Sequence, residues 1–295
     1  MKQELLKNRN KGEKKSFGGV INLMTSGYSG MKVVFLLMFL LLSIFAQSQS
    51  KVETKSTQVK TLVWSDEFDK NGLPDSTKWN FELGKARANK EPQYHTKDLK
   101  NVRVENGKLI ITSRLELIDT VKKYTSARIN TKGKFQFTYG RVEVRAKLPQ
   151  GRGVWPAIWT LGVTGGWPAC GEIDIMEYWG HNPNTVASNV HTRDYNHTKG
   201  TGRGGKITYE KPFADFHIYA LEWYKDRMDF YMDDKMFYSC VSKGEGIGEW
   251  PFNAPQYLIL NQALSNNWKP GEAGIDDSIF PQEFIVDYVR VYELK

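Results

Sequence analysis

The stretches FHIYALEWY, residues 216–224, and RMDFYMDD, residues 227–234, carry the pattern that decides the fold. Apolar and polar side chains alternate through much of both, and aromatic residues are frequent. A period of two is typical of a strand with one buried face. We therefore predict a β-strand in each of the two stretches.

Similar segments recur along the chain, separated by clusters of Gly, Asn, Asp and Pro. Further examples are KLIITSRLEL at 108–117, GRVEVRAKL at 140–148 and EFIVDYVRVYEL at 283–294. No long amphipathic helical stretch interrupts them. Many short strands without helices indicate two antiparallel sheets packed face to face. The sequence thus predicts an all-β sandwich or jelly roll.

The length and charge of the chain limit the alternatives. With 295 residues, 40% of them hydrophobic, one well-packed domain is expected. Seven of the 41 Lys and Arg residues and two of the 33 Asp and Glu residues fall within residues 1–50, which leaves 34 bases against 31 acids. A near-balanced remainder without a basic stripe gives no reason to expect nucleic acid as a partner.

The basic excess belongs to an N-terminal leader. Residues 33–46 form an apolar run that follows Lys32 and precedes small residues, the layout of a secretory signal peptide. The run is shorter than the roughly 20 residues of a membrane span. We predict a signal peptide at 31–49, a disordered or mis-assigned extension at 1–30, and one domain at 50–295. The protein is then secreted, periplasmic or extracellular, without a stable membrane anchor.

Two cysteines, Cys170 and Cys240, occur in the chain. Secretion implies an oxidising compartment, but pairing depends on a distance that the sequence does not give. Because a domain of this size does not need a disulfide, we expect two buried free thiols.

The most informative stretch for function is WPACGEIDIMEYWG, residues 167–180. It holds Glu172, Asp174 and Glu177 among apolar neighbours, which is unusual for a strand. Side chains at 172 and 174 point to one face of an extended strand. The first two acids are therefore expected to share a surface.

Glu177 has the opposite parity to the first two acids. A β-bulge at Ile175 or Met176 inserts one extra residue and would return Glu177 to their face, and bulges are frequent beside active sites. The residues then predict a bulged strand with three acids along one cleft.

Paired carboxylates in a cleft are the machinery of glycoside hydrolysis. With the bulge counted, the two glutamates lie roughly 13 Å apart between Cα atoms, and side chains leaning inward close most of that distance. Retaining enzymes hold their carboxyl groups about 5 to 5.5 Å apart, and the spacing is compatible with this. One glutamate would attack the anomeric carbon and the other would transfer protons. Asp174, between them, would raise the pKa of its neighbours by repulsion.

The alternative is a solvated strand face, the usual setting of Asp and Glu in a half-exposed sheet. Nearby tryptophans favour the cleft, because sugar rings present C–H faces that stack on indole. Trp155 and Trp179 are the preferred candidates for lining it, and Trp159 fits either the cleft or the core.

The chain resembles glycoside hydrolase family 16, in particular its laminarinase-like bacterial members. The resemblance runs from WSDEFD at 64–69 to VDYVRVYEL at 286–294, and its most specific element is the Glu-x-Asp-x-x-Glu motif of residues 172–177. Supporting segments are SARINTKGKFQFTYGRVEVRAKLP at 126–149, GVWPAIWTLG at 153–162 and NVHT at 189–192.

This resemblance implies a concanavalin-like β-jelly roll with a substrate cleft on its concave sheet, and makes residues 50–295 the catalytic domain. It implies that Glu172 is the nucleophile, Asp174 its helper and Glu177 the acid/base. His191 matches a family histidine that faces the catalytic acids. No cofactor is implied for catalysis.

Further positions match cleft residues of the family. They are Asn89, Glu91, Gln93 and Tyr94 at the cleft wall, Arg128 near the glycone side, and Gln262 near the acids. The chain departs from the common pattern at Pro92, at His95 and in SNNWKPGE at 265–272. Because these departures lie where subsites are built, they leave the linkage specificity open.

Family members often hold a calcium ion away from the cleft. The matching positions are Glu67, the carbonyl of Gly107, and Asp287, an all-oxygen set that suits a hard cation. A structural calcium is therefore an expectation, and ordinary turn carboxylates are the alternative.

Several functions fit the motif. The first is a secreted, retaining, monomeric endo-β-glucanase acting on β-1,3 or mixed-linkage β-1,3-1,4 glucan. An agarase or carrageenase uses the same acids, and a transglycosylase uses the same intermediate. A non-catalytic carbohydrate-binding jelly roll would have little use for three mutually repelling acids.

Overall fold

The computed structural model describes residues 60–295 apart from 87, 119 and 267–273. Residues 58–295 form one compact unit by their contacts. The predicted extension at 1–30 and signal peptide at 31–49 lie outside the described residues.

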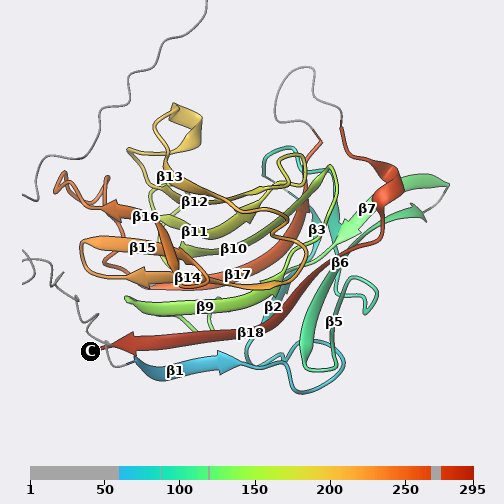
Figure 1. Cartoon of the computed structure of the whole chain (residues 1–295), viewed down its shortest axis with the longest axis horizontal. Helices are drawn as coiled ribbons and strands as arrows, with labels where there is room; N and C mark the ends of the chain where they lie inside the picture. Colours follow the sequence, from blue (N-terminus) through green and yellow to red (C-terminus); the bar gives the residue numbers. More distant parts are fainter. Residues whose placement is uncertain (1–59, 87, 119, 267–273) are drawn as a thin grey trace, which may run out of the picture. The chain divides into compact units, whose positions relative to one another are not determined.

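Eleven strands form the larger sheet. They are β1 (Lys60–Asp66), β3 (Gly84–Lys85), β4 (Tyr94–His95), β5 (Val102–Glu105), β6 (Lys108–Ile118), β7 (Val121–Ser126), β9 (Gly140–Lys147), β14 (Phe216–Trp223), β15 (Arg227–Met232), β16 (Lys235–Val241) and β18 (Gln282–Leu294). Their order is β16-β15-β14-β9-β18-β6-β7-β4-β3, with β1 paired to β18 and β5 to β6 (Figure 1). Pairing is antiparallel except for the short parallel pair β4–β7.

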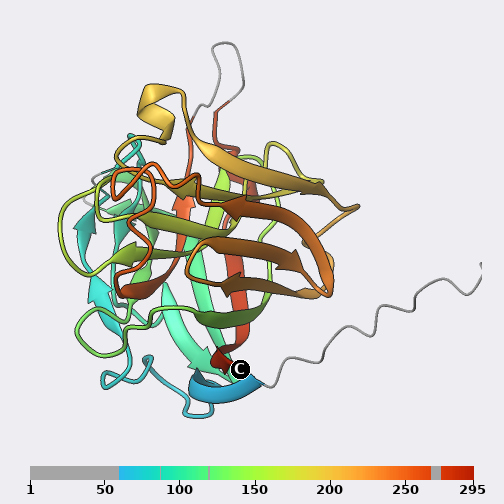
Figure 2. The same cartoon turned by 90° about the vertical axis from the view of Figure 1, so that its left-hand side faces the viewer.

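Seven strands form the smaller sheet. They are β2 (Asn80–Glu82), β8 (Arg128–Asn130), β10 (Val154–Gly162), β11 (Glu172–Tyr178), β12 (Thr185–His191), β13 (Arg203–Thr208) and β17 (Gln256–Leu264). Their order is β13-β12-β11-β10-β17-β8-β2, antiparallel throughout, and neighbours far apart in sequence lie side by side in both views (Figure 2).

The two sheets pack face to face through the residues that the alternation predicts as apolar. In β9, Val142, Val144 and Ala146 are buried while the charged residues between them are half-buried. They share one apolar cluster with Ile158 of β10 and Ile173 of β11. Each Val or Ile side chain in this cluster contributes about 1.5–3 kcal/mol when fully buried. The predicted all-β sandwich is confirmed.

Helical structure is slight in the described part of the chain. It consists of two short 3₁₀ helices, η1 (His197–Lys199) and η2 (Asp277–Ile279). None of the helices described is long and apolar enough to cross a membrane. Cys170 and Cys240 are both buried free thiols, as predicted.

Candidate active site

A cavity of about 450 Å³ opens on the smaller sheet, and alternate residues of β10 form its floor. Trp155, Ala157, Trp159 and Leu161 face it, whereas Ile158 between them belongs to the core. This alternation follows from the period of two in a strand. The cavity is also lined by Ala88, Asn89, Glu91, Arg128, Trp167, Glu172, Asp174, Glu177, His197, Thr198, Asn261 and Ala263.

The predicted bulge is present in β11. Opposite β10, Met176 pairs with Ile158 and Asp174 pairs with Trp159, so Ile175 has no counterpart. The same irregularity appears on the β12 side between positions 174 and 177. One extra residue is therefore inserted at the place that the parity of the acids requires.

This bulge brings Glu177 to the cavity together with Glu172 and Asp174. Its backbone is supported from β12, because the buried Ser188 hydroxyl donates a hydrogen bond of 2.8 Å to the Ile175 carbonyl. An exposed strand face, the alternative reading of these acids, is excluded by the burial of Asp174 and Glu177.

The Glu172 carboxyl is desolvated, and it accepts a hydrogen bond from the indole N–H of Trp167. Burial, and then the charge of Asp174, raise the pKa of Glu172 well above its usual range. A hydrogen bond between Glu172 and Asp174 favours the proton on Glu172 and the charge on Asp174 in this arrangement. The two carboxyls are thus close enough to share one proton.

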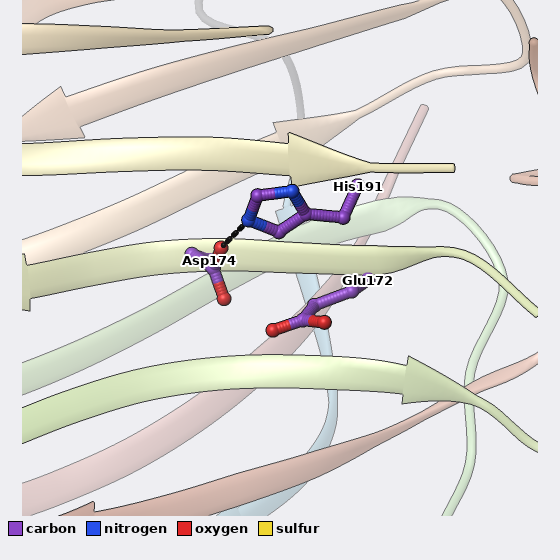
Figure 3. Close-up of side chains that lie close together, drawn as sticks. All are labelled: Glu172, Asp174 and His191. Carbon is purple, nitrogen blue, oxygen red and sulfur yellow. Dashed lines mark ion pairs between the residues drawn. The ribbon is translucent and has the colours of Figure 1, made fainter. Parts of the chain in front are cut away.

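Asp174 also faces His191. The His191 Nε2 atom lies 3.3 Å from an Asp174 carboxylate oxygen, and the two side chains point toward each other above Glu172 (Figure 3). Burial, followed by the charge of Glu177, raises the pKa of Asp174 well above its usual range. His191 therefore lies beside the acids as predicted, although it does not line the cavity itself.

Glu177 is held by two donors. Trp155 Nε1 donates to one carboxylate oxygen at 3.0 Å, and the Asn189 amide donates to the other. Burial raises the pKa of Glu177 to about 7, against the lowering effect of the Asn189 hydrogen bond. A carboxyl with this pKa can give and take a proton near neutral pH, as an acid/base requires.

The floor beside β17 combines an aromatic ring with polar groups. Trp159 Nε1 donates to the Asn261 side chain at 2.6 Å. The Arg128 guanidinium lies 5.2 Å from the centre of the Trp159 ring and 3.3 Å from a Glu82 carboxylate oxygen. Trp159 therefore belongs to the cleft, and the predicted Arg128 lies beside it.

The cleft wall at residues 89–95 contains a buried polar network of Glu91, Gln93 and His95. Gln93 Nε2 lies 2.7 Å from a Glu91 carboxylate oxygen and 3.1 Å from His95 Nε2, while the side-chain Oε1 of Gln93 accepts a hydrogen bond from the Leu264 N–H. Burial, and then the charge of Arg128, lower the pKa of His95 to about 3. His95 is therefore neutral, and its Nε2 accepts from Gln93.

That network presents Glu91 to the cavity and keeps Gln93 behind it. Asn89 lines the cavity and forms a hydrogen bond with Glu91. Burial raises the pKa of the Glu91 carboxyl. Tyr94 does not line this cavity but an adjoining one. Of the four predicted wall residues, two therefore face the cavity.

Gln262 was predicted near the acids, and the structure contradicts this. Its side chain is fully buried and donates to Ser113 Oγ at 2.5 Å and to the Gln282 carbonyl at 3.3 Å, both in the larger sheet. Strand alternation is the reason: Asn261 and Ala263 on either side of Gln262 face the cavity.

Trp179 lies behind Trp155 and not at the cavity surface. Its ring packs on Trp155, with centroids 6.0 Å apart, and it does not line the cavity. Of the two tryptophans predicted to line the cleft, Trp155 and Trp179, only Trp155 does so.

The residues of the site that sequence reasoning missed include Trp167, Asn189, His197 and Asn261. Two of them had a signal. Asn189 shares the strand parity of His191, and Asn261 alternates with leucines of the core. The 3₁₀ turn of His197 offered no such pattern.

Two of the residues matched to calcium, Glu67 and Asp287, face arginine side chains in the structure. Glu67 accepts hydrogen bonds of 3.0 and 2.8 Å from Arg290, and Asp287 accepts one of 2.6 Å from Arg145. Because each carboxylate already faces a guanidinium group, calcium would have to displace both arginines. In the described residues, one group of three candidate ligands approaches within 4.8 Å, namely Glu172, Asp174 and His191. The carboxylate chemistry of the site requires no metal there.

Comparison with known proteins identifies the class that this fold and site define. The family model for glycosyl hydrolases family 16 matches residues 90–278, and the chain belongs to that family. It is a glycoside hydrolase with the predicted jelly-roll fold.

Several proteins of known name are similar to this chain. A β-glucanase of Rhodothermus marinus is 47% identical, over 78% of this chain and 84% of that protein. A keratan-sulfate endo-1,4-β-galactosidase of Sphingobacterium multivorum is 37% identical, over 84% of this chain and 60% of its own length. The crystal structure of the Rhodothermus marinus laminarinase matches with a TM-score of 0.76 and 45% identity, covering 81% of this chain and 99% of that one.

Proposed function

We propose that the protein is a secreted, retaining endo-β-glucanase that hydrolyses internal β-1,3 bonds of laminarin-type glucan or bonds of mixed-linkage β-1,3-1,4 glucan. The observation that carries the proposal is the bulged strand β11, which holds Glu172, Asp174 and Glu177 in one tryptophan-lined cavity. Similarity to a β-glucanase and a laminarinase supports glucan as the substrate. The apolar run at 33–46 supports secretion.

In the first step Glu172 attacks the anomeric carbon, and the bond from that carbon to the glycosidic oxygen breaks. Glu177 gives its proton to the departing oxygen, so the leaving sugar departs with a neutral hydroxyl. A pKa of about 7 keeps a large fraction of Glu177 protonated at neutral pH. Asp174 takes up the proton shared with Glu172, which frees the Glu172 carboxylate for attack.

In the second step water attacks the same carbon from the face that the leaving sugar vacated. Glu177, now ionised, removes a proton from that water, and the ester bond to Glu172 breaks. Two inversions restore the original configuration. The His191 ring, 3.3 Å from Asp174, limits the movement of that side chain during both steps.

Trp155 and Trp159 line the cavity and contribute aromatic surface for contact with sugar rings. Arg128, Asn89 and Glu91 add polar groups to the same cavity for sugar hydroxyls. This combination of a few polar groups on an aromatic floor suits a neutral polysaccharide.

A galactan is the second candidate substrate, because one relative is an endo-1,4-β-galactosidase. The deciding experiment is chromatography of products after incubating residues 50–295 with laminarin, barley glucan, lichenan and agarose. Short oligosaccharides from laminarin are expected. Products from agarose alone would replace glucan by galactan, and inertness on all four would leave a carbohydrate-binding jelly roll.

Retention has its own test. Proton NMR of the earliest product is expected to show the β-anomer before mutarotation, whereas an initial α-anomer would contradict the double displacement. Sugar acceptors added in excess separate hydrolysis from glycosyl transfer, since transfer yields longer oligosaccharides.

A further inference from the structure

A second cavity adjoins the catalytic one. It shares Ala88 and Glu91 with that cavity, so the same stretch of chain forms a wall of both. Its remaining lining comes from the strand β7, at Val121, Lys123 and Tyr124, and from Lys85, Ala86, Lys90, Pro92 and Tyr94. The short parallel pairing of β4 with β7 brings these segments together.

Three lysines, Lys85, Lys90 and Lys123, line this second cavity. None of them forms an ion pair with any residue in the described ranges, in contrast to Lys100, which lies 2.9 Å from Glu116. The one acid among the lining residues is Glu91, and that carboxyl is buried in the hydrogen-bond network of the cleft wall. The cavity therefore carries a local positive charge.

Apolar surface accompanies the charge. The Val121 residue is 54% exposed and Tyr94 is 38% exposed. An exposed tyrosine ring offers a stacking face to a sugar, and the lysines around it offer ammonium groups. A neutral hexose would use the ring but leave the three charges without partners.

We propose that this lysine-lined cavity is a distal subsite for polysaccharide units that bear a carboxylate or a sulfate ester. The inference extends the proposed function, because it rests on a polysaccharide already held in the catalytic cavity. A chain that reaches past Glu91 enters the second cavity. The near-neutral charge of residues 51–295 does not reveal this site, since Lys123 of β7 joins Lys85 and Lys90 from a separate segment of the chain.

The test compares three forms of one β-1,3-glucan: neutral, lightly carboxymethylated and lightly sulfated. The wild type and the triple variant Lys85→Gln, Lys90→Gln, Lys123→Gln are assayed at low salt. For the wild type, KM is expected to be about fivefold to tenfold lower on an anionic form than on the neutral one, the size that three exposed ion pairs supply. In the triple variant the ratio should fall to about one, while kcat on neutral oligosaccharides stays the same.

A matched control removes the same charge elsewhere. Lys211, Lys225 and Lys235 line neither cavity, form no ion pair among the described residues, and are exposed. Lys211 also has the left-handed backbone of Lys90, with φ of 54° against 55°. Changing these three to Gln should keep the preference for anionic glucan.

Loss of the preference in both triple variants would assign it to overall charge and overturn the subsite. An equal KM of the wild type on neutral and anionic glucan would overturn it as well. Preference for the carboxymethylated or the sulfated form identifies the group that is bound, and 0.5 M salt should abolish it. Failure of the proposed function looks different, since the wild type would then leave neutral glucan uncut.

Discussion

Two groups of carboxylates meet opposite environments, one in β11 of the smaller sheet and the other at the larger sheet. On the smaller sheet, Asp174 and Glu177 are buried near another acid, with tryptophan, asparagine and histidine side chains as their neighbours. At the larger sheet, Glu67, which follows the end of β1, faces Arg290 of β18, and Asp287 of β18 faces Arg145 of β9. Burial raises the pKa of Glu177 to about 7, whereas the Arg290 hydrogen bond lowers the pKa of Glu67.

This difference assigns the two groups of carboxylates to different purposes, catalysis for the buried acids and stability for the arginine-paired ones. A carboxylate paired with an arginine stays ionised and contributes modestly to folding. Carboxyls that are buried together resist ionisation, which costs stability but supplies a proton donor at neutral pH. The contrast predicts that equivalent substitutions on the two sheets will have opposite consequences.

The largest expected effect is on catalysis. Glu172→Gln removes the nucleophile, and kcat on laminarin should fall at least about ten-thousandfold. Glu67→Gln on the larger sheet should keep kcat within about twofold, because Glu67 lies outside the cavity. Reducing-sugar assays measure both, and binding of the inactive variant to laminarin checks its fold. Undiminished hydrolysis by Glu172→Gln would remove it as the nucleophile.

The next effect concerns pH. Because Glu177 must be protonated in the first step, kcat/KM should fall as the pH rises through about 7. Asn189→Ala removes a hydrogen bond that lowers the pKa of Glu177, so this basic limb should move to higher pH. Asn261→Ala is the control, since that amide serves Trp159 and should leave the limb in place. If Asn189→Ala left the basic limb of the kcat/KM profile unchanged, the limb would not report the ionisation of Glu177.

Stability should respond with opposite signs on the two sheets. The folded pKa of Glu177 lies above its unfolded value, so ionisation destabilises the fold as the pH rises past the unfolded value of 4.5. Glu177→Gln should therefore stabilise the protein by about 2–3 kcal/mol at pH 8, with a gain that shrinks toward pH 4.

Glu67→Gln should act in the other direction. The lowered pKa of Glu67 gives stability that is present above its unfolded value and lost as the pH falls through the folded one. Because the pair with Arg290 is about one third exposed, its loss should cost only about 0.2–1 kcal/mol at pH 8. Urea titrations at pH 4 and pH 8 measure both variants, and the same sign for both would contradict the contrast.

Much of this site could be predicted from the sequence because strand geometry is regular. Alternation in GRVEVRAK became the buried and half-buried faces of β9. The odd spacing of Glu177 required a bulge, and the bulge is present at Ile175. The same rule places Gln262 in the core, because it shares parity with Leu258, Leu260 and Leu264, whereas the family resemblance placed it near the acids.

Other features depend on contacts that no local pattern encodes. His197 reaches the cavity on a 3₁₀ turn, and Trp167 reaches it from a loop before β11. The lysine-lined cavity combines segments about 30 residues apart in the chain. The net charge of the whole chain does not reveal such a local cluster of lysines. Such sites require the fold before they can be recognised.

The smallest expected effect tests the calcium expectation on the larger sheet. Since Arg290 and Arg145 already neutralise Glu67 and Asp287, calcium should not stabilise this protein. Melting temperatures in EGTA and in 5 mM calcium should agree within about 1 °C, with magnesium as the control for ionic strength. A saturable rise specific to calcium would mean that the cation displaces Arg290 from Glu67. In that case Glu67→Gln should abolish the rise, and the paired acids of this sheet would be a metal site after all.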